Sequence, residues 1–212
     1  MADNKNEFAA IIDKVAKGME KKVQGPPTVR KSVVEDYARL MMGFGYDLTP
    51  DTMAILVDYL KGYNLWLCGC VGVGKTYFFD IMNKIRLSKG LDPIKKLSML
   101  ETQGWTMSTA RDWADDSREF NVVIDDVGTE PLMKSYGQEA ELFPYLLEKR
   151  MQLTGKRTHL TSNLGPQDIK KRYGERVADR FVQMFKMEPL KAKKSRRVLR
   201  PWKASKNGDG VS

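Results

Sequence analysis

The glycine-rich stretch that decides the fold of this chain runs Gly69-Cys70-Val71-Gly72-Val73-Gly74-Lys75-Thr76. A glycine, four residues and then Gly-Lys-Thr is the spacing of a phosphate-binding P-loop. Its glycines allow the backbone to turn tightly and to point successive N–H groups at phosphate oxygens. In such a loop the lysine reaches the terminal phosphates and the following hydroxyl holds Mg²⁺, which assigns these roles to Lys75 and Thr76.

The sequence on both sides of the loop supports this assignment. Residues 64–68 are mostly apolar and predict a buried strand, while residues 75–89 predict a helix. A helix N-terminus adds partial positive charge to an anion site, so a chance match of a flexible glycine turn is the weaker alternative. The sequence therefore predicts a nucleoside triphosphate site, with ATP as the cofactor, at Gly69, Cys70, Val71, Gly72, Val73, Gly74, Lys75, Thr76 and Tyr77.

A second motif, about fifty residues downstream, is an apolar run that ends in two aspartates, Phe120-Asn121-Val122-Val123-Ile124-Asp125-Asp126. A buried strand delivers such carboxylates to its C-terminal edge, where nucleotides bind in open α/β sheets. Asp125 is placed to support Mg²⁺, directly or through water, and Asp126 to orient or activate the attacking water. A strand that merely ends in an acidic turn is the alternative, which the P-loop upstream makes the weaker one.

Hydrophobic periodicity predicts an α/β chain of alternating helices and strands. Ser32 is a plausible N-cap for the first helix of the main region, and Thr49 with Pro50 starts the second. The expected helices are 6–23, 32–44, 49–61, 102–116, 138–154, 166–173 and 175–184, and the further strands are 93–100, 158–163 and an edge strand at 185–188. Asn163 ends its strand on the nucleotide side and is a candidate for contact with the γ-phosphate or its attacking water, although an asparagine at a strand end is common.

Length and composition limit the possible classes of protein. With 212 residues, of which 42% are apolar and 30% charged, one domain of ordinary size with short appendages is expected. A polar N-terminus and the absence of a long apolar run argue against a signal peptide or membrane span. Cys68 and Cys70 suit neither a disulfide nor a four-ligand metal site, so we expect reduced thiols that fill small spaces in a cytoplasmic protein. His159 is expected in the core rather than as a ligand or base.

Four stretches of this sequence, taken together, resemble the DnaC and IstB group of AAA+ ATPases over about residues 30 to 190. The P-loop is one of them, and it is shared with many other proteins. The more specific ones are Val122-Val123-Ile124-Asp125-Asp126-Val127-Gly128, Thr161-Ser162-Asn163-Leu164 and Tyr173-Gly174-Glu175-Arg176-Val177-Ala178-Asp179-Arg180-Phe181.

The resemblance implies a fold and roles for particular residues. The expected fold is an AAA+/RecA-like P-loop core, with a parallel central sheet flanked by helices and no C-terminal lid domain. Asp125 and Asp126 match the Walker B pair, and Asn163 matches the sensor 1 residue. Arg180 matches the arginine finger, which acts on ATP bound by a neighbouring subunit, and Arg176 is its companion at i, i+4 on the same helix face. A plain surface arginine is the alternative for both positions.

The resemblance also implies a function, which is that of a DNA replication ATPase similar to DnaC-type helicase loaders. Such a protein acts as a homo-oligomer with Mg²⁺ and ATP, on single-stranded DNA or on a replicative helicase. The alternatives are an IstB-like helper of a transposase, a small-molecule phosphotransferase and a non-hydrolysing ATP switch. A short loader of this kind suits a phage or other mobile element.

The segments outside the matched region, 1–30 and 191–212, carry separate expectations, with the ATPase core assigned to 31–190. Helix 6–23 and the linker after it form a partner-docking element or pack back on the core, and these options stay open. The net charge is +9, and nine basic residues against one acidic residue lie between Lys186 and Lys206. The DNA association of the family favours phosphate contacts over a merely solvated tail at Lys191, Lys193, Lys194, Arg196, Arg197 and Arg200.

Overall fold

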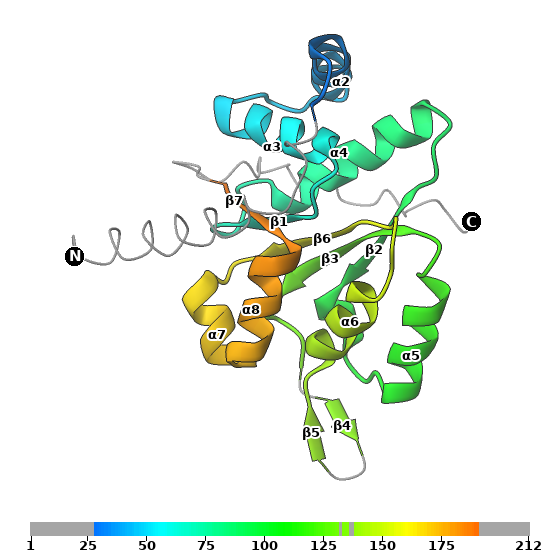
Figure 1. The fold of residues 1–212 in the computed structure, drawn as a ribbon, viewed down its shortest axis with the longest axis vertical. Helices are drawn as coiled ribbons and strands as arrows, with labels where there is room; N and C mark the ends of the chain where they lie inside the picture. The colour runs from blue at the N-terminus through cyan, green and yellow to red at the C-terminus, as the bar shows by residue number, and fades with distance from the viewer. Residues whose placement is uncertain (1–27, 132, 136–137, 191–212) are drawn as a thin grey trace, which may run out of the picture.

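A computed structural model describes residues 28–131, 133–135 and 138–190 of the chain. The expected docking helix at 6–23 and the basic tail after residue 190 lie outside the described residues. The elements, labelled in Figure 1, are α2 (Lys31–Gly43), α3 (Pro50–Lys61), β1 (Leu65–Cys68), α4 (Lys75–Ser88), β2 (Ile94–Ser98), the 3-10 helix η1 (Met99–Thr102), α5 (Met107–Asp116), β3 (Asn121–Val127), β4 (Met133–Ser135), β5 (Gln138–Ala140), α6 (Leu142–Met151), β6 (Thr158–Ser162), α7 (Pro166–Tyr173), α8 (Glu175–Met184) and β7 (Lys186–Pro189).

The main sheet has five strands in the order β2-β3-β6-β1-β7, and every neighbouring pair is parallel. The chain leaves β1 through α4, crosses to β2 at the far edge and returns through β3 and β6, before β7 pairs with the other side of β1. Strand order therefore reverses at β1, and ligands of open α/β sheets bind at the carboxyl ends of strands beside such a reversal. The P-loop follows β1 at this point.

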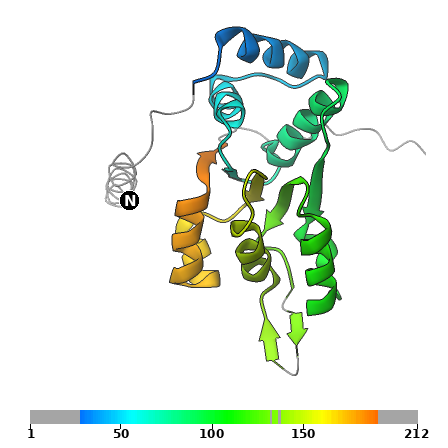
Figure 2. The same ribbon diagram turned by 45° about the vertical axis from the view of Figure 1, so that its right-hand side comes forward.

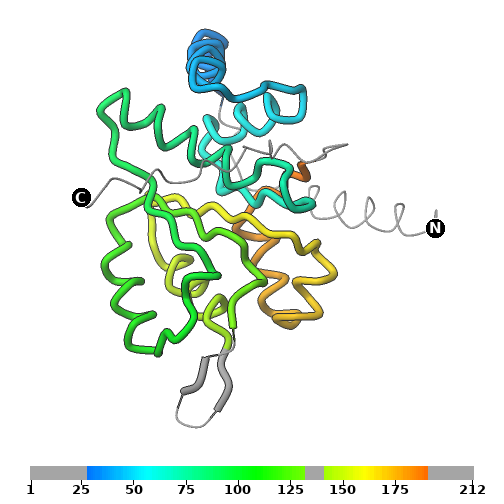
Figure 3. Tube along the Cα trace, turned by 180° about the vertical axis from the view of Figure 1, so that it is seen from behind, coloured from blue at the N-terminus to red at the C-terminus, as the bar shows by residue number. Residues whose placement is uncertain are grey.

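Helices cover both faces of the sheet, so the strands are buried from two sides. Figures 1 and 3 show α2, α3 and α4 on one face and α5, α6, α7 and α8 on the other. Successive side chains of a strand point to opposite faces. Accordingly, Leu65 and Leu67 of β1 belong to the core under α3 and α4, whereas Trp66 and Cys68 belong to the core under α8. The predicted α/β fold with a parallel central sheet flanked by helices is confirmed.

The helix predicted over 138–154 is wrong at its start. Residues 138–140 form β5, which pairs antiparallel with β4 in a separate two-stranded hairpin (Figure 2), and α6 begins only at Leu142. Pro144 explains the difference. Proline is tolerated in the first helical turn, but deeper in a helix it removes a hydrogen bond and clashes with the preceding turn. A helix that began at residue 138 would place Pro144 in its interior.

Two other helix starts also differ from the prediction. The helix expected over 102–116 begins at Met107, where the Thr106 hydroxyl accepts from the Thr109 N–H at 3.2 Å, and η1 precedes it. Ser32 is not an N-cap, because α2 starts one residue earlier, after Arg30. The Thr49 cap and the Pro50 start of α3 are confirmed.

His159 lies in the core, as predicted. Its ring is 1% exposed between Tyr59 and Phe79, and its Nδ1 accepts a hydrogen bond from the Leu65 N–H at 3.1 Å. Burial lowers the pKa of His159 to about 3, so the ring is neutral at physiological pH.

Both cysteines are free thiols, but only Cys68 is buried, so the expectation that both fill small spaces is wrong for Cys70. No helix within the described ranges has the length and apolar character needed to cross a membrane.

Candidate nucleotide-binding site

The loop between β1 and α4 bounds a pocket of about 880 Å³ at the carboxyl end of the sheet. Gly72 and Gly74 have φ angles of 84° and 97°, a left-handed conformation that side chains with a Cβ rarely adopt. Gly74 immediately precedes α4, so the loop curls over the helix N-terminus and its partial positive charge. The pocket is lined by Gly45, Tyr46, Asp47, Val71, Gly72, Gly74, Lys75, Thr76, Tyr77, Leu100, Asp126, Thr129 and Asn163.

Lys75 is the cation of this pocket and is 6% exposed. Its ammonium group donates to the Gly69 carbonyl at 2.7 Å, to the Cys70 carbonyl at 3.0 Å and to Asn163 Oδ1 at 2.7 Å. Burial lowers the pKa of Lys75, and the carboxylates of Asp126 and Asp125 oppose that shift by favouring the charged form. The ammonium therefore connects the start of the loop with Asn163 at the end of β6.

Thr76 and Asp125 form a pair of oxygen ligands beside the helix start. The Thr76 hydroxyl donates to Asp125 Oδ1 at 2.8 Å, and the Thr161 hydroxyl donates to the same oxygen at 2.5 Å. Hydroxyl and carboxylate oxygens are the donors that Mg²⁺ prefers, and this ion is usually held by one or two such groups plus phosphate and water. The described part of the chain has no cluster of three or more His, Cys, Asp or Glu residues suited to a metal. The pair fits Mg²⁺ that arrives with a triphosphate.

Asp126 faces the pocket because the strand is irregular at this residue. Its φ angle is 57°, and the β3–β6 register shifts between Ile124 and Val127. In a regular strand Asp125 and Asp126 would point to opposite faces of the sheet. Here Asp125 lies beneath Thr76, whereas Asp126 lines the pocket, so the bulge directs two consecutive carboxylates to one site.

Arg180, matched to the arginine finger, and its companion Arg176 lie away from this pocket, on α8. The Arg180 guanidinium is 22% exposed and forms an ion pair with Glu148 of α6 at 3.5 Å, while Arg176 is exposed. Val177 and Phe181 are buried, and they hold the opposite side of α8 against the core. Of the predicted site residues, the structure thus brings together Lys75, Thr76, Asp125, Asp126 and Asn163, and it places Arg176 and Arg180 elsewhere on the chain.

The predicted loop residues do not all line the pocket. Gly69, Cys70 and Val73 do not line it, although the first two hold Lys75 through their carbonyls and Val73 is buried in the core. Conversely, the sequence did not point to Gly45, Tyr46, Asp47, Leu100 and Thr129, which do line it. The ring of Tyr46 stacks on Tyr77, with centroids 5.5 Å apart, and so joins the turn between α2 and α3 to the P-loop helix.

Comparisons with known proteins place this geometry in a fold class. No protein-family model matches the chain, and no curated protein is significantly similar to it in sequence. The crystal structure of the DnaC helicase loader is similar over 74% of this chain and 99% of that chain, with a TM-score of 0.53 and 20% identity. The AMPPCP-bound DnaA structure from Aquifex aeolicus is similar over 72% of this chain, with a TM-score of 0.50 and 17% identity. The match spans 50% of that DnaA chain.

These likenesses concern the fold. The parallel sheet with a P-loop after β1 has the AAA+-like P-loop fold of these two structures. More particularly, the fold is DnaC-like, as the four sequence stretches predicted.

Proposed function

We propose that this protein binds Mg-ATP and hydrolyses it. The observation that carries the proposal is the position of Lys75, which joins the P-loop to Asn163 inside the pocket that Asp126 lines. In this proposal Lys75 binds phosphate, Asp126 orients water and Asn163 contacts the terminal phosphate. Hydrolytic P-loop sites bring groups with these roles together. A pocket built only to bind nucleotide would not need the bulge that turns Asp126 inward.

The chain's own residues suggest how hydrolysis proceeds. Lys75 exchanges its carbonyl partners for β- and γ-phosphate oxygens, and backbone N–H groups of the loop hold the same phosphates. Asp126 accepts a hydrogen bond from a water molecule and orients it toward the γ-phosphorus, with Asn163 on the other side of the terminal phosphate. The water oxygen bonds to phosphorus as the bond to the β-phosphate bridging oxygen breaks. Mg²⁺, held by Thr76 and Asp125, would neutralise charge on the phosphate oxygens.

We further propose that the protein acts in DNA replication as a helicase-loader type ATPase. One of the solved structures that the chain resembles, matched over 99% of that structure's length and 74% of this chain, is described as a helicase loader. In this proposal the chain assembles into a homo-oligomer, and Arg180 of one subunit reaches the ATP of the next. The basic residues after Leu190 contact single-stranded DNA, and the client is a replicative helicase.

The proposal is tested by measuring phosphate release from ATP with and without single-stranded DNA and a replicative helicase. The unmodified chain is expected to hydrolyse ATP and to be stimulated by DNA. Lys75→Ala removes a charged donor to phosphate, so nucleotide affinity should fall about 10- to 100-fold. The control is Lys84→Ala, which changes an exposed lysine of α4 and should leave both the rate of ATP hydrolysis and the nucleotide affinity unchanged. Absence of ATP hydrolysis in the unmodified chain under all of these conditions would falsify the enzymatic proposal.

The proposed role of Arg180 predicts a defect that appears only on assembly. Arg180→Ala should lower DNA-stimulated hydrolysis at least about tenfold, because a missing finger leaves charge at the γ-phosphate unstabilised. ATP affinity of the isolated chain should not change, since Arg180 lies outside its own pocket. Mixing Arg180→Ala with Lys75→Ala chains should restore part of the activity. Arg111→Ala on the exposed side of α5 is the matched control, and unchanged stimulated activity in Arg180→Ala would rule out the finger role.

A further inference from the structure

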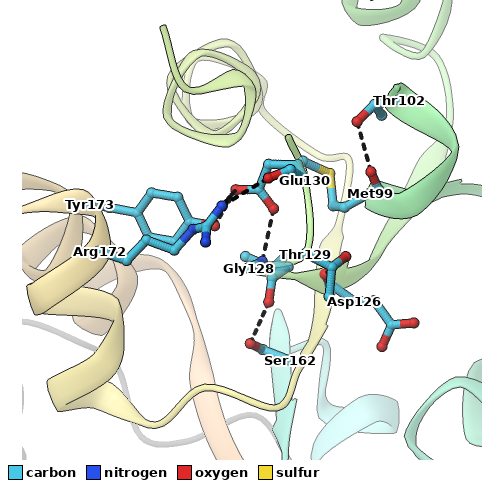
Figure 4. A network of polar contacts seen from close by, with 10 residues as sticks. Met99, Thr102, Asp126, Gly128, Thr129, Glu130, Ser162, Arg172 and Tyr173 are labelled. Carbon is cyan, nitrogen blue, oxygen red and sulfur yellow. Dashed lines mark hydrogen bonds and ion pairs between the residues drawn. The ribbon is translucent and has the colours of Figure 1, made fainter. Parts of the chain in front are cut away.

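Glu130 is a buried carboxylate that the proposed chemistry does not use. It is 3% exposed and lies between the end of β3 and the end of α7 (Figure 4). Its Oε2 accepts from the Gly128 N–H at 2.9 Å, and its Oε1 accepts from the Tyr173 hydroxyl. Arg172 donates to the Glu130 carbonyl at 2.9 Å and lies 3.7 Å from Oε1. Each carboxylate oxygen therefore has its own donor, from a different element.

This arrangement is specific for a charged acceptor. A buried carboxylate is costly unless it is hydrogen-bonded and paired, and Glu130 has both kinds of partner. Burial and the neighbouring Glu130 carboxylate raise the pKa of Tyr173, so its hydroxyl keeps its proton and stays a donor. The Tyr173 ring also packs against Phe143 of α6, with centroids 5.3 Å apart, which fixes its direction.

The same short segment forms part of the nucleotide pocket on its other side. Thr129 lines the pocket, and both its N–H and its hydroxyl donate to the Asp126 carbonyl, at 3.1 Å and 2.7 Å. In Figure 4, the carboxylates of Asp126 and Glu130 point to opposite sides of this segment. A shift of Asp126 on nucleotide binding, as it orients water beside the terminal phosphate, would therefore be passed to Glu130 through this hydrogen-bonded turn.

Tyr173 passes such a shift to the helix that carries the arginines. It is the last residue of α7, and only Gly174 separates it from the start of α8. Arg176 lies in the first turn of α8, and the buried side chains of Val177 and Phe181 pack that helix against the core. The pocket segment and the helix that carries the arginines are thus joined by the hydrogen bond between Glu130 and Tyr173.

From these contacts we propose that Glu130 is a positioning residue, which makes the nucleotide pocket and the α7–α8 pair respond to nucleotide as one unit. The proposal rests on the proposed function in one respect, which is that nucleotide enters the pocket lined by Asp126 and Thr129. Hydrolysis is not required for it. Glu130 itself is not among the residues that line the pocket.

Glu130→Gln and Tyr173→Phe separate this role from simple stability. A glutamine has one acceptor oxygen, so it cannot accept from both the Gly128 N–H and the Tyr173 hydroxyl. If its oxygen faces Gly128, the hydroxyl proton of Tyr173 loses its acceptor. Tyr173→Phe removes only the hydroxyl and keeps the ring packing. In the double variant the amide oxygen introduced by Glu130→Gln can accept from the Gly128 N–H, and no Tyr173 hydroxyl remains that needs an acceptor. The loss of response in the double variant should therefore not exceed the loss in Glu130→Gln alone.

The readout is amide hydrogen exchange of the full chain with and without the non-hydrolysable analogue AMPPCP. In the unmodified chain, AMPPCP is expected to slow exchange in α7 and the first turn of α8 as well as in the P-loop. Both single variants should keep the P-loop response and lose most of the response in α7 and α8. Retention of the α7–α8 response in both variants, or its absence from the unmodified chain, would overturn the proposal.

Steady-state kinetics gives a second, independent measurement. Glu130→Gln is expected to lower kcat about tenfold while KM changes less than about threefold, because misplacement of the Asp126 segment affects chemistry more than binding. Ile55→Val, a truncation of a buried core residue of α3, should lower Tm without this kcat effect. A kcat loss in Ile55→Val equal to that in Glu130→Gln would make the effect one of stability and overturn the proposal. If AMPPCP slows amide exchange in both the P-loop and α7–α8 but the chain hydrolyses no ATP, only the enzymatic proposal is contradicted.

Discussion

Asp126→Asn is expected to lower kcat for ATP hydrolysis by about two to three orders of magnitude, with ATP affinity unchanged within about threefold. The backbone at this residue has a φ angle of 57°, which few residues other than glycine, asparagine and aspartate adopt readily. Asparagine therefore preserves the bulge and removes only the negative charge. The loss would then belong to the carboxylate that orients the attacking water, rather than to a distorted strand.

Two companion variants and one equilibrium measurement make this result specific. Asp125→Asn should instead weaken Mg²⁺-dependent binding, because Asp125 pairs with the Thr76 hydroxyl. Asp47→Asn changes another carboxylate that lines the pocket, which the proposed chemistry does not use, and it should leave kcat close to that of the unmodified chain. Nucleotide affinity is measured by fluorescence titration and kcat by phosphate release. A kcat for Asp126→Asn within a factor of about three of the unmodified value would exclude Asp126 as the water-orienting group.

The parts of the site that could be predicted from the sequence are those encoded by residues close together in the chain. The P-loop, its strand and its helix are contiguous, and their spacing alone predicts a backbone that curls around phosphate. The same holds for Asp125 and Asp126, since an apolar strand that ends in carboxylates delivers them to the sheet edge. The bulge that turns Asp126 into the pocket has no comparable signal, because it depends on the pairing of Val127 with Ser162 in β6.

Long-range contacts explain what the sequence did not predict. The turn with Tyr46 and Asp47 becomes part of the site only because Tyr46 stacks on Tyr77 across the fold. Glu130 reads as a surface residue of a polar turn, and its burial depends on Tyr173, more than forty residues away along the chain. Pro144, in contrast, was a local signal: it excludes the long helix that the apolar spacing of residues 138–154 suggested.

Arg150 is the clearest case of a residue whose role only the structure reveals. It is one of two adjacent cations in the last turn of α6, a position where a charged side chain is usually solvated. In the structure it is 1% exposed, and burial lowers its pKa to about 10, so it still carries its charge at neutral pH. Its guanidinium donates to the carbonyls of Ser117, Phe120 and Arg157 at 2.9, 3.0 and 3.2 Å, and to the Thr158 hydroxyl at 3.0 Å.

These contacts predict that Arg150→Met lowers the free energy of unfolding by about 3–5 kcal/mol, measured by urea denaturation. Methionine fills much of the space, but it removes four hydrogen bonds from a charged donor, each worth about 1.5–3 kcal/mol before relaxation. The Ser117 and Arg157 carbonyls keep the N–H donors of Phe120 and Val122, which limits the loss. Lys149→Met, on the neighbouring residue with an exposed side chain, should change stability by less than about 0.5 kcal/mol. The loss of stability in Arg150→Lys should lie between the losses in Lys149→Met and Arg150→Met, because an ammonium on a flexible stem cannot reproduce the planar fork of the guanidinium. Equal stability of Arg150→Met and Lys149→Met would mean that water replaces the guanidinium at these carbonyls, and that α6 does not depend on Arg150 to hold the starts of β3 and β6.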